Sequence, residues 1–176
     1  MKLLDGLLRI FDTTAFVAVA ALMGGMGLIA FTAVIYRFVL LDPIRWSEEA
    51  ARYMMVWVTF LGAGYAMGKG KHIGVTMFVD KLPEKGRRIS LCVAEIVILL
   101  FLAAVAVQGG NLIFSLRKQT SPAMGLPMWI PYLAVPVGAV HMFLHVLRMM
   151  LSRSVRALST ADIELDVALR RKGDGL

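Results

Sequence analysis

The chain has 176 residues, of which 59% are hydrophobic and 18% are charged, whereas soluble domains carry roughly 25% charged residues. This composition excludes an ordinary soluble domain and predicts an integral membrane protein. A net charge of +7 would favour nucleic acid in a soluble protein, but here the basic residues lie between apolar segments, so we expect no nucleic-acid partner.

Four segments are long and apolar enough to cross a bilayer, because a core of about 30 Å needs roughly 20 helical residues. Lipid offers the backbone no hydrogen-bond partner and the segments lack the alternation of barrel strands, so we expect helices. The predicted fold is an all-α integral membrane domain over 1–152, followed by a tail over 153–176. Its four transmembrane helices are expected at residues 14–36, 50–67, 89–107 and 129–151.

The positions of Lys and Arg predict the orientation of the chain. Fourteen of these residues lie before the first segment, between the second and third, or from Arg148 to the end of the chain. Five lie on the other side, at or near the other two loops: Arg37, Arg45, Arg52, Arg117 and Lys118. Basic residues accumulate on the cytoplasmic side of a membrane. Both termini and the middle loop are therefore expected in the cytoplasm.

The first segment has one face of small residues, formed by Ala20, Gly24 and Gly27. Small side chains allow helices to approach closely in a membrane. We interpret this face as a packing surface for a partner subunit.

The stretch "RWSEEAARYMMVWVTF", residues 45–60, carries its charges at the start of the second segment. Arg45 with Glu49, and Glu48 with Arg52, are spaced i, i+4, which predicts ion pairs on the helix surface. Aromatic anchors for the membrane interface are expected on one stripe, formed by Trp46, Tyr53 and Trp57. The opposite, polar-to-small stripe is expected to pack against a partner and includes Arg52, Thr59, Ala63 and Ala66. An alternative is that Glu48 or Glu49 binds a substrate or a coupling ion.

The middle loop contains apolar residues spaced i, i+3, i+4 and i+7. This spacing predicts a short amphipathic helix that lies in the cytoplasmic interface of the membrane. The apolar residues that would anchor it are Val75, Phe78, Val79 and Leu82.

Ionisable residues inside membrane segments are costly and suggest function or a specific partner. Glu95 lies inside the third segment, and the fourth segment has one face with Ala134, Gly138, His141, His145 and Arg148. We predict that Glu95 pairs with His145 or Arg148 and ties the two helices together; a coupling-proton role for Glu95 is the alternative. His141 and His145 are spaced to share a metal, but no third ligand is visible in the sequence, so no metal, haem or other cofactor is expected.

Two stretches resemble a known family: "WSEEAARYMMVWVTFLGAGYAMGKGKHIGVTMFVDKLP" over 46–83 and "SPAMGLPMWIPYLAVPVG" over 121–138. They are similar to the small membrane subunit of tripartite ATP-independent periplasmic (TRAP) transporters, the DctQ-like permease family. The resemblance covers about residues 10–150, and the entry to the last segment is among its most specific parts.

The resemblance implies a scaffold subunit in a bacterial inner membrane, without catalytic or substrate-binding residues. Its partners would be a large elevator-type membrane subunit, a periplasmic substrate-binding protein and membrane lipids, and the assembly would use an ion gradient, usually Na⁺, to import organic acids. Candidates for contact with the soluble protein are Arg45, Glu48, Glu49, Arg117 and Lys118. Two other classes are weighed beside it: a self-sufficient proton-coupled exporter that uses Glu95, and a membrane anchor for a redox enzyme.

Overall fold

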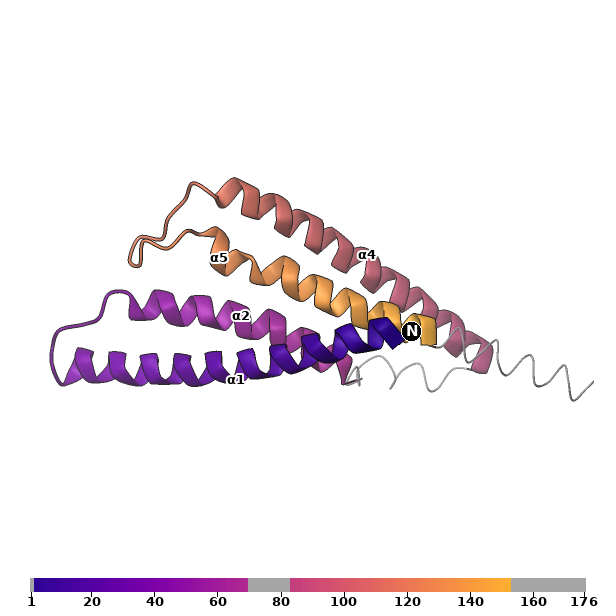
Figure 1. Ribbon diagram of the computed structural model, residues 1–176, viewed down its shortest axis with the longest axis horizontal. Coiled ribbons are helices and arrows are strands. Elements are labelled where there is room, and N and C mark those ends of the chain that lie inside the picture. Colours follow the sequence, from indigo (N-terminus) through magenta and orange to yellow (C-terminus); the bar gives the residue numbers. More distant parts are fainter. Residues whose placement is uncertain (1, 70–82, 153–176) are drawn as a thin grey trace, which may run out of the picture.

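The computed structural model describes residues 2–69 and 83–152, and these residues are helical apart from two connecting loops (Figure 1). The helices are α1 (Lys2–Phe38), α2 (Ser47–Gly68), α4 (Glu84–Leu116) and α5 (Trp129–Tyr132). A turn at Leu133 joins α5 to a further helical segment, and the label α5 is used below for the whole of Trp129–Ser152. The predicted amphipathic helix (Val75, Phe78, Val79, Leu82) and the tail over 153–176 lie outside the described residues.

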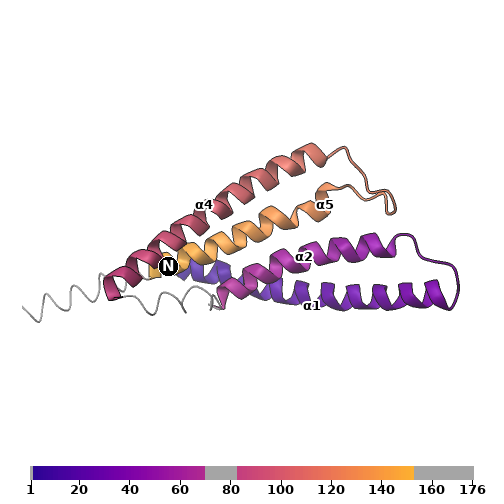
Figure 2. The same cartoon turned by 180° about the vertical axis from the view of Figure 1, so that it is seen from behind.

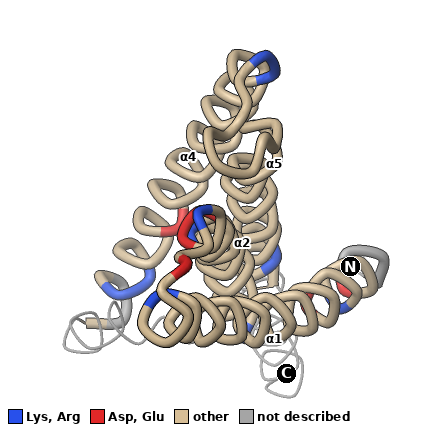
Figure 3. The backbone as a smooth tube through the Cα atoms, turned by 90° about the vertical axis from the view of Figure 1, so that its left-hand side faces the viewer, with Lys and Arg blue, Asp and Glu red and all other residues tan. Residues whose placement is uncertain are grey.

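The all-α membrane class predicted from the sequence is confirmed. Within residues 2–69 and 83–152, three helices are long and apolar enough to cross a membrane, over Asp5–Phe38, Gly86–Leu116 and Trp129–Ser152. α2 is 22 residues long but is less apolar, since it includes polar and aromatic side chains and several glycines. Long stretches of the other helices carry no charged residue (Figure 3), for example residues 13–36 of α1.

α1 begins well before the apolar segment expected at 14–36. Its first three turns contain Asp5, Arg9 and Asp12, which a membrane-spanning stretch would not normally include. Here both aspartates contact side chains of α5, Asp12 at His141 and Asp5 at Arg148. The first turns of α1 are therefore part of the packed bundle.

The helices form two antiparallel pairs, α1 with α2 and α4 with α5 (Figures 1 and 2). The loops 39–46 and 117–128 lie at the same end of the bundle, which we call the loop end. The start of α1 and the end of α5 lie at the opposite end, which we call the N-terminal end. This up-and-down arrangement brings residues from three helices together near the N-terminal end.

In the described part of the chain few apolar residues are buried. One cluster of them joins α2, α4 and α5 and consists of Met67, Leu102, Ala139 and Val146. In the most apolar 18-residue stretch of α1, no residue is buried within the chain. In the corresponding stretch of α5, 39% of the residues are buried. α1 therefore offers its apolar surface to lipid or to another protein.

The loop end is organised by Glu49. Its carboxylate accepts hydrogen bonds from the backbone N–H groups of Ala123 and Met124, at 3.0 and 3.2 Å, and from the hydroxyl of Tyr53. Residues 119–128 fold back on themselves, with the N–H of Ser121 donating to the carbonyl of Leu126 at 2.8 Å. α2 thus fixes the loop that connects α4 to α5.

The predicted i, i+4 ion pairs of Arg45 with Glu49 and Glu48 with Arg52 are wrong. Glu48 pairs instead with Arg37 of α1 at 3.6 Å, and Glu49 binds the loop. Helix-surface spacing considers only neighbours on the same helix, whereas here a second helix and a loop supply better-placed partners.

A buried carboxylate–histidine cluster as candidate functional site

Two histidines lie on the buried face of α5. His141 and His145 are one helical turn apart and therefore point the same way, and they are only 1% and 4% exposed. Asp12 of α1 lies opposite them, with its Oδ1 atom 3.0 Å from Nε2 of His141 and 2.8 Å from Nε2 of His145. The two Nε2 atoms are themselves 3.2 Å apart. One carboxylate oxygen and two imidazole nitrogens thus converge on a single point.

α2 makes room for these rings with glycine. A Cβ atom added to Gly64 would lie 2.8 Å from Cγ of His141, and one added to Gly68 would lie 2.8 Å from Nε2 of His145. Real Cβ atoms essentially never come so close to another heavy atom. The two glycines of α2 are therefore required at these positions for the histidines of α5 to face Asp12.

The polar contacts of His141 are confined to one side of its ring. Its Nδ1 atom is buried and has no hydrogen-bond partner within residues 2–69 and 83–152. The ring therefore makes its polar contacts through Nε2.

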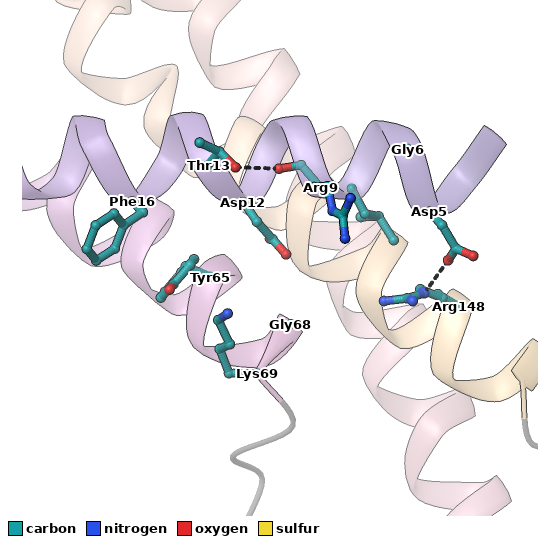
Figure 4. Close-up of a pocket in the computed structure, with 11 residues that line it drawn as sticks. Asp5, Gly6, Arg9, Asp12, Thr13, Phe16, Tyr65, Gly68, Lys69 and Arg148 are labelled. Atoms are coloured by element: carbon teal, nitrogen blue, oxygen red, sulfur yellow. Dashed lines mark hydrogen bonds and ion pairs between the residues drawn. The ribbon is translucent and has the colours of Figure 1, made fainter. Parts of the chain in front are cut away.

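A second contact between α1 and α5 lies nearer the N-terminal end. The carboxylate of Asp5 is 2.6 Å from Nε of Arg148, and both side chains are 45% exposed. This pair and Asp12 line a cavity of about 800 Å³ between α1, α2 and α5 (Figure 4). The same cavity has basic groups at Arg9 and Lys69.

The sequence predicted that Glu95 pairs with His145 or Arg148. Both of these residues contact α1 carboxylates, and the tie to Glu95 stays a prediction. Glu95 is buried on α4, at 7% exposure. α1 reaches His145 and Arg148 because it packs as a helix from Lys2 onward, a feature that the apolar segment at 14–36 did not reveal.

Asp5 and Asp12 are the site residues that sequence reasoning missed. A usable signal was present in their spacing. They are seven residues apart, which places them on one face of a helix two turns apart, and His141 and Arg148 are also seven residues apart. Two antiparallel helices with matched seven-residue spacing can pair at both positions.

The two stripes predicted to pack against a partner subunit point away from the rest of the chain. Cβ atoms added to Gly24 and Gly27 would have nothing within 4 Å. Every other member of the stripes is exposed as well: Ala20, Arg52, Thr59, Ala63 and Ala66. These residues do not form the packing between α1 and α2.

Of the predicted aromatic anchors, Trp46 and Tyr53 lie at or near the start of α2 and Trp57 lies midway along it. Trp46 is 45% exposed, while Tyr53 and Trp57 are half-buried. Four of the outer charged residues are exposed, namely Arg45, Glu48, Arg117 and Lys118. Glu49, the fifth, is engaged with residues 123 and 124.

The fold and this cluster define a polytopic helical membrane protein whose helices are joined by charged and polar contacts. Residues 26–156 match the model of the family described as tripartite ATP-independent periplasmic transporters, DctQ component. The chain belongs to this family, as the resemblance indicated. It is therefore a transporter component and not an enzyme.

Individual relatives agree with the family assignment. The chain is 27% identical over 165 residues to the C4-dicarboxylate TRAP transporter small permease protein DctQ of Rhodobacter capsulatus, covering 76% of this chain and 73% of the relative. It is 35% identical over 112 residues to the sialic acid TRAP transporter small permease protein SiaQ of Vibrio cholerae, covering 60% and 61%.

A third relative is much longer. The chain is 33% identical over 126 residues to the isethionate TRAP transporter permease protein DctMQ of Oleidesulfovibrio alaskensis, covering 70% of this chain but only 20% of the relative. These comparisons do not support the alternative of a self-sufficient exporter.

Proposed function

We propose that this chain is the small scaffold subunit of a TRAP transporter that takes up organic acids across a bacterial inner membrane. In this proposal the chain supports a large, elevator-type membrane subunit, and a gradient of Na⁺ ions drives transport. The observation that carries the proposal is the match of residues 26–156 to the DctQ component.

The large subunit is proposed as the direct partner. A chain like this one accounts for only 20% of the DctMQ permease protein, so the remainder of that relative is long enough for a second membrane subunit in the same polypeptide. The exposed apolar surface of α1 fits such a partner, because surfaces of this kind mark contacts with protein or lipid.

α2 is proposed as the fourth transmembrane helix. Its 22 residues extend about 33 Å at 1.5 Å per residue, enough to cross a bilayer core. It runs antiparallel to α1, which is itself apolar enough to cross (Figure 1). With four spans and the distribution of basic residues, both termini would face the cytoplasm.

The small-residue stripes of α1 and α2 are proposed to contact the large subunit. They are exposed and uncovered by the chain itself, and small residues are the ones that allow close helix contact in a membrane. Trp46, Tyr53 and Trp57 would anchor α2 at the outer interface.

The loop end would face the periplasm and the soluble binding protein. Its exposed charges, from Arg45, Glu48, Arg117 and Lys118, suit a transient polar contact. The relatives carry different substrates in their names, C4-dicarboxylate, sialic acid and isethionate. This variety supports a scaffold role in which other subunits select the substrate.

The proposal is tested by co-expression with the large membrane subunit and purification in mild detergent. We expect a stable complex, and Na⁺-dependent uptake into vesicles only when both membrane subunits and the binding protein are present. Gly24→Leu with Gly27→Leu should abolish copurification, because leucine would hold the helices apart. Gly110→Leu is the matched control, since Gly110 is an exposed glycine of α4 with nothing within 4 Å of its Cβ position. Uptake by vesicles that hold this chain alone would refute the proposal.

A further inference from the structure

The cluster of Asp12, His141 and His145 has the composition and shape of a metal site. We propose that these three residues bind one divalent first-row transition-metal ion, of the zinc or cobalt class, and that the ion clamps α1 to α5. One ligand atom from each residue lies within 4.8 Å of the other two. Asp12 supplies the third ligand that the sequence did not reveal, from a helix more than a hundred residues away.

The spacing of the three atoms suits a small ion. Zinc–nitrogen and zinc–oxygen bonds of about 2.0–2.2 Å put neighbouring ligands about 3.0 Å apart when they meet at right angles, and about 3.4 Å apart in a tetrahedron. The three separations observed are 2.8, 3.0 and 3.2 Å. Because these separations are shorter than two such bonds placed end to end, an ion bonded to all three atoms would lie to one side of their plane.

The donor set selects the class of ion. Two imidazoles and one carboxylate suit zinc, cobalt, nickel and iron(II). Calcium and magnesium prefer sites made entirely of oxygen ligands, and sodium, the proposed coupling ion, shares that preference for oxygen. The site is therefore distinct in chemistry from a coupling-ion site.

The protein holds the ligands in place before an ion arrives. All three side chains come from helices, and ligands on rigid helices are positioned more accurately than ligands on loops. Gly64 and Gly68 leave space for the two rings at the helix contact and for little else. The Nδ1 atom of His141 has no partner in the described part of the chain, so Nε2 is the atom through which this ring acts.

The remaining coordination positions of the ion can be filled from the neighbouring cavity. Three protein ligands leave at least one position of a zinc-type ion unfilled. Asp12 belongs both to the cluster and to the wall of the 800 Å³ cavity (Figure 4), and its side chain is 26% exposed. Water or another small ligand can therefore reach the ion from the cavity.

The same contacts would arise if Asp12 only accepted hydrogen bonds from the two rings. The two cases differ in what an added ion does. A histidine ligand must offer a free lone pair at Nε2, so each neutral ring would then carry its proton on Nδ1 and would no longer donate to Asp12. Saturable metal binding is therefore the observable that separates the two cases.

The test uses the full chain in complex with its large subunit, purified on a tag without histidine and stripped of metal with a chelator. Co²⁺ is titrated and followed by its visible absorption, and Zn²⁺ bound per complex is counted by mass spectrometry. We expect one bound ion per complex at saturation and a ligand-field spectrum for Co²⁺. Absence of a saturable equivalent in the unsubstituted complex would overturn the proposal.

Substitutions test whether the bound metal ion lies at this cluster. Loss of a supporting contact behind a ligand costs roughly 10 to 100-fold in affinity, so loss of a ligand in Asp12→Asn or His145→Gln should cost at least about 100-fold. Asp5→Asn is the matched control, since Asp5 lies on the same face of α1 but pairs with Arg148, and it should bind as the unsubstituted protein does. Asp12→His keeps three ligands and should retain the equivalent. Equal affinity in Asp12→Asn and Asp5→Asn would place the ion elsewhere and overturn the proposal.

Discussion

The two ends of the bundle are held together by different kinds of contact. At the N-terminal end, the carboxylate of Asp12 contacts two imidazoles whose side chains are 0% and 3% exposed. At the loop end, Arg37 and Glu48 form a pair whose side chains are 63% and 78% exposed. Interactions between charged groups strengthen as water is excluded, and a buried group that loses its partner is costly. The N-terminal end should therefore contribute most to the specific arrangement of the helices.

This difference matters because apolar burial alone contributes little to the choice of which helices pair in a membrane. Few apolar residues of the described chain are buried, and lipid is as apolar as the side chains that helices bury against one another. Shape and polar contacts must then select the partners. Close contacts at glycine occur along the bundle, since a Cβ atom added to Gly138 of α5 would lie 2.8 Å from the carbonyl oxygen of Phe60 of α2. The buried polar contacts lie around Asp12, where α1, α2 and α5 meet.

The largest effect is expected from removing the shared carboxylate. Asp12→Ala leaves two buried imidazoles without their common partner, and we expect a loss of about 3 kcal/mol in stability, near the cost of breaking a buried pair. The loss of stability is measured by thermal unfolding of the complex, monitored by size-exclusion chromatography. Asp5→Ala should cost about 1 kcal/mol or less, because Asp5 and Arg148 are both 45% exposed and such pairs contribute little. Equal losses would mean that burial does not distinguish the two contacts.

The next effect tests the fit of α2 against α5. In Gly64→Ala the new methyl group would lie 2.8 Å from Cγ of His141, so the ring must move away from Asp12 or the helices must separate. Overpacking of this kind costs about 2 kcal/mol. The same unfolding measurement on Gly110→Ala is the control.

The control substitution, Gly110→Ala, should raise the stability instead of lowering it. A Cβ atom at Gly110 meets nothing within 4 Å, and replacing an exposed helical glycine by alanine stabilises a helix by up to about 1 kcal/mol. A destabilisation of Gly110→Ala as large as that of Gly64→Ala would show that the loss is general to glycines of this chain and not specific to the histidine contact.

Much of the helical framework could be predicted from the sequence because apolar segments and helical periodicity are local properties. The shared face of His141 and His145 on α5 followed from their spacing alone. Their partner did not follow, because Asp12 lies outside the apolar segment at 14–36 and its contact depends on how α1 and α5 are aligned. The role of Gly64 was equally invisible, since it depends on which ring of another helix lies opposite.

The same limit explains the loop end. Glu49 has a basic residue four positions before it, which favours a pair on its own helix. Its actual partners are Tyr53 and backbone N–H groups of the loop more than seventy residues away. Residue spacing predicts contacts within one helix, and it does not predict contacts with a distant loop that folds over the end of that helix.

The smallest effect is expected from Glu49, which lies at the start of α2 near the solvent-exposed loop, and it depends on pH. The hydrogen bond from Tyr53 is the main cause that lowers the pKa of Glu49 from its ordinary value of 4.5; side-chain contact with Ser121 and the N–H groups of Ala123 and Met124 act in the same direction, against the effect of burial. A carboxyl group with a lowered folded-state pKa stabilises the fold above its ordinary pKa and loses this contribution as the pH falls through the lowered value.

Glu49→Gln should therefore unfold at a lower temperature than the unsubstituted protein near neutral pH. The difference should shrink as the pH is lowered past 4.5 and through the folded-state pKa, because both proteins then carry a neutral group. Arg37→Gln is the matched control at the same end: its pair with Glu48 is exposed, so its effect should stay within about 0.5 kcal/mol. A difference for Glu49→Gln that is independent of pH would mean that the side chain acts through its shape and not through its charge, and the loop end would then be held by packing alone.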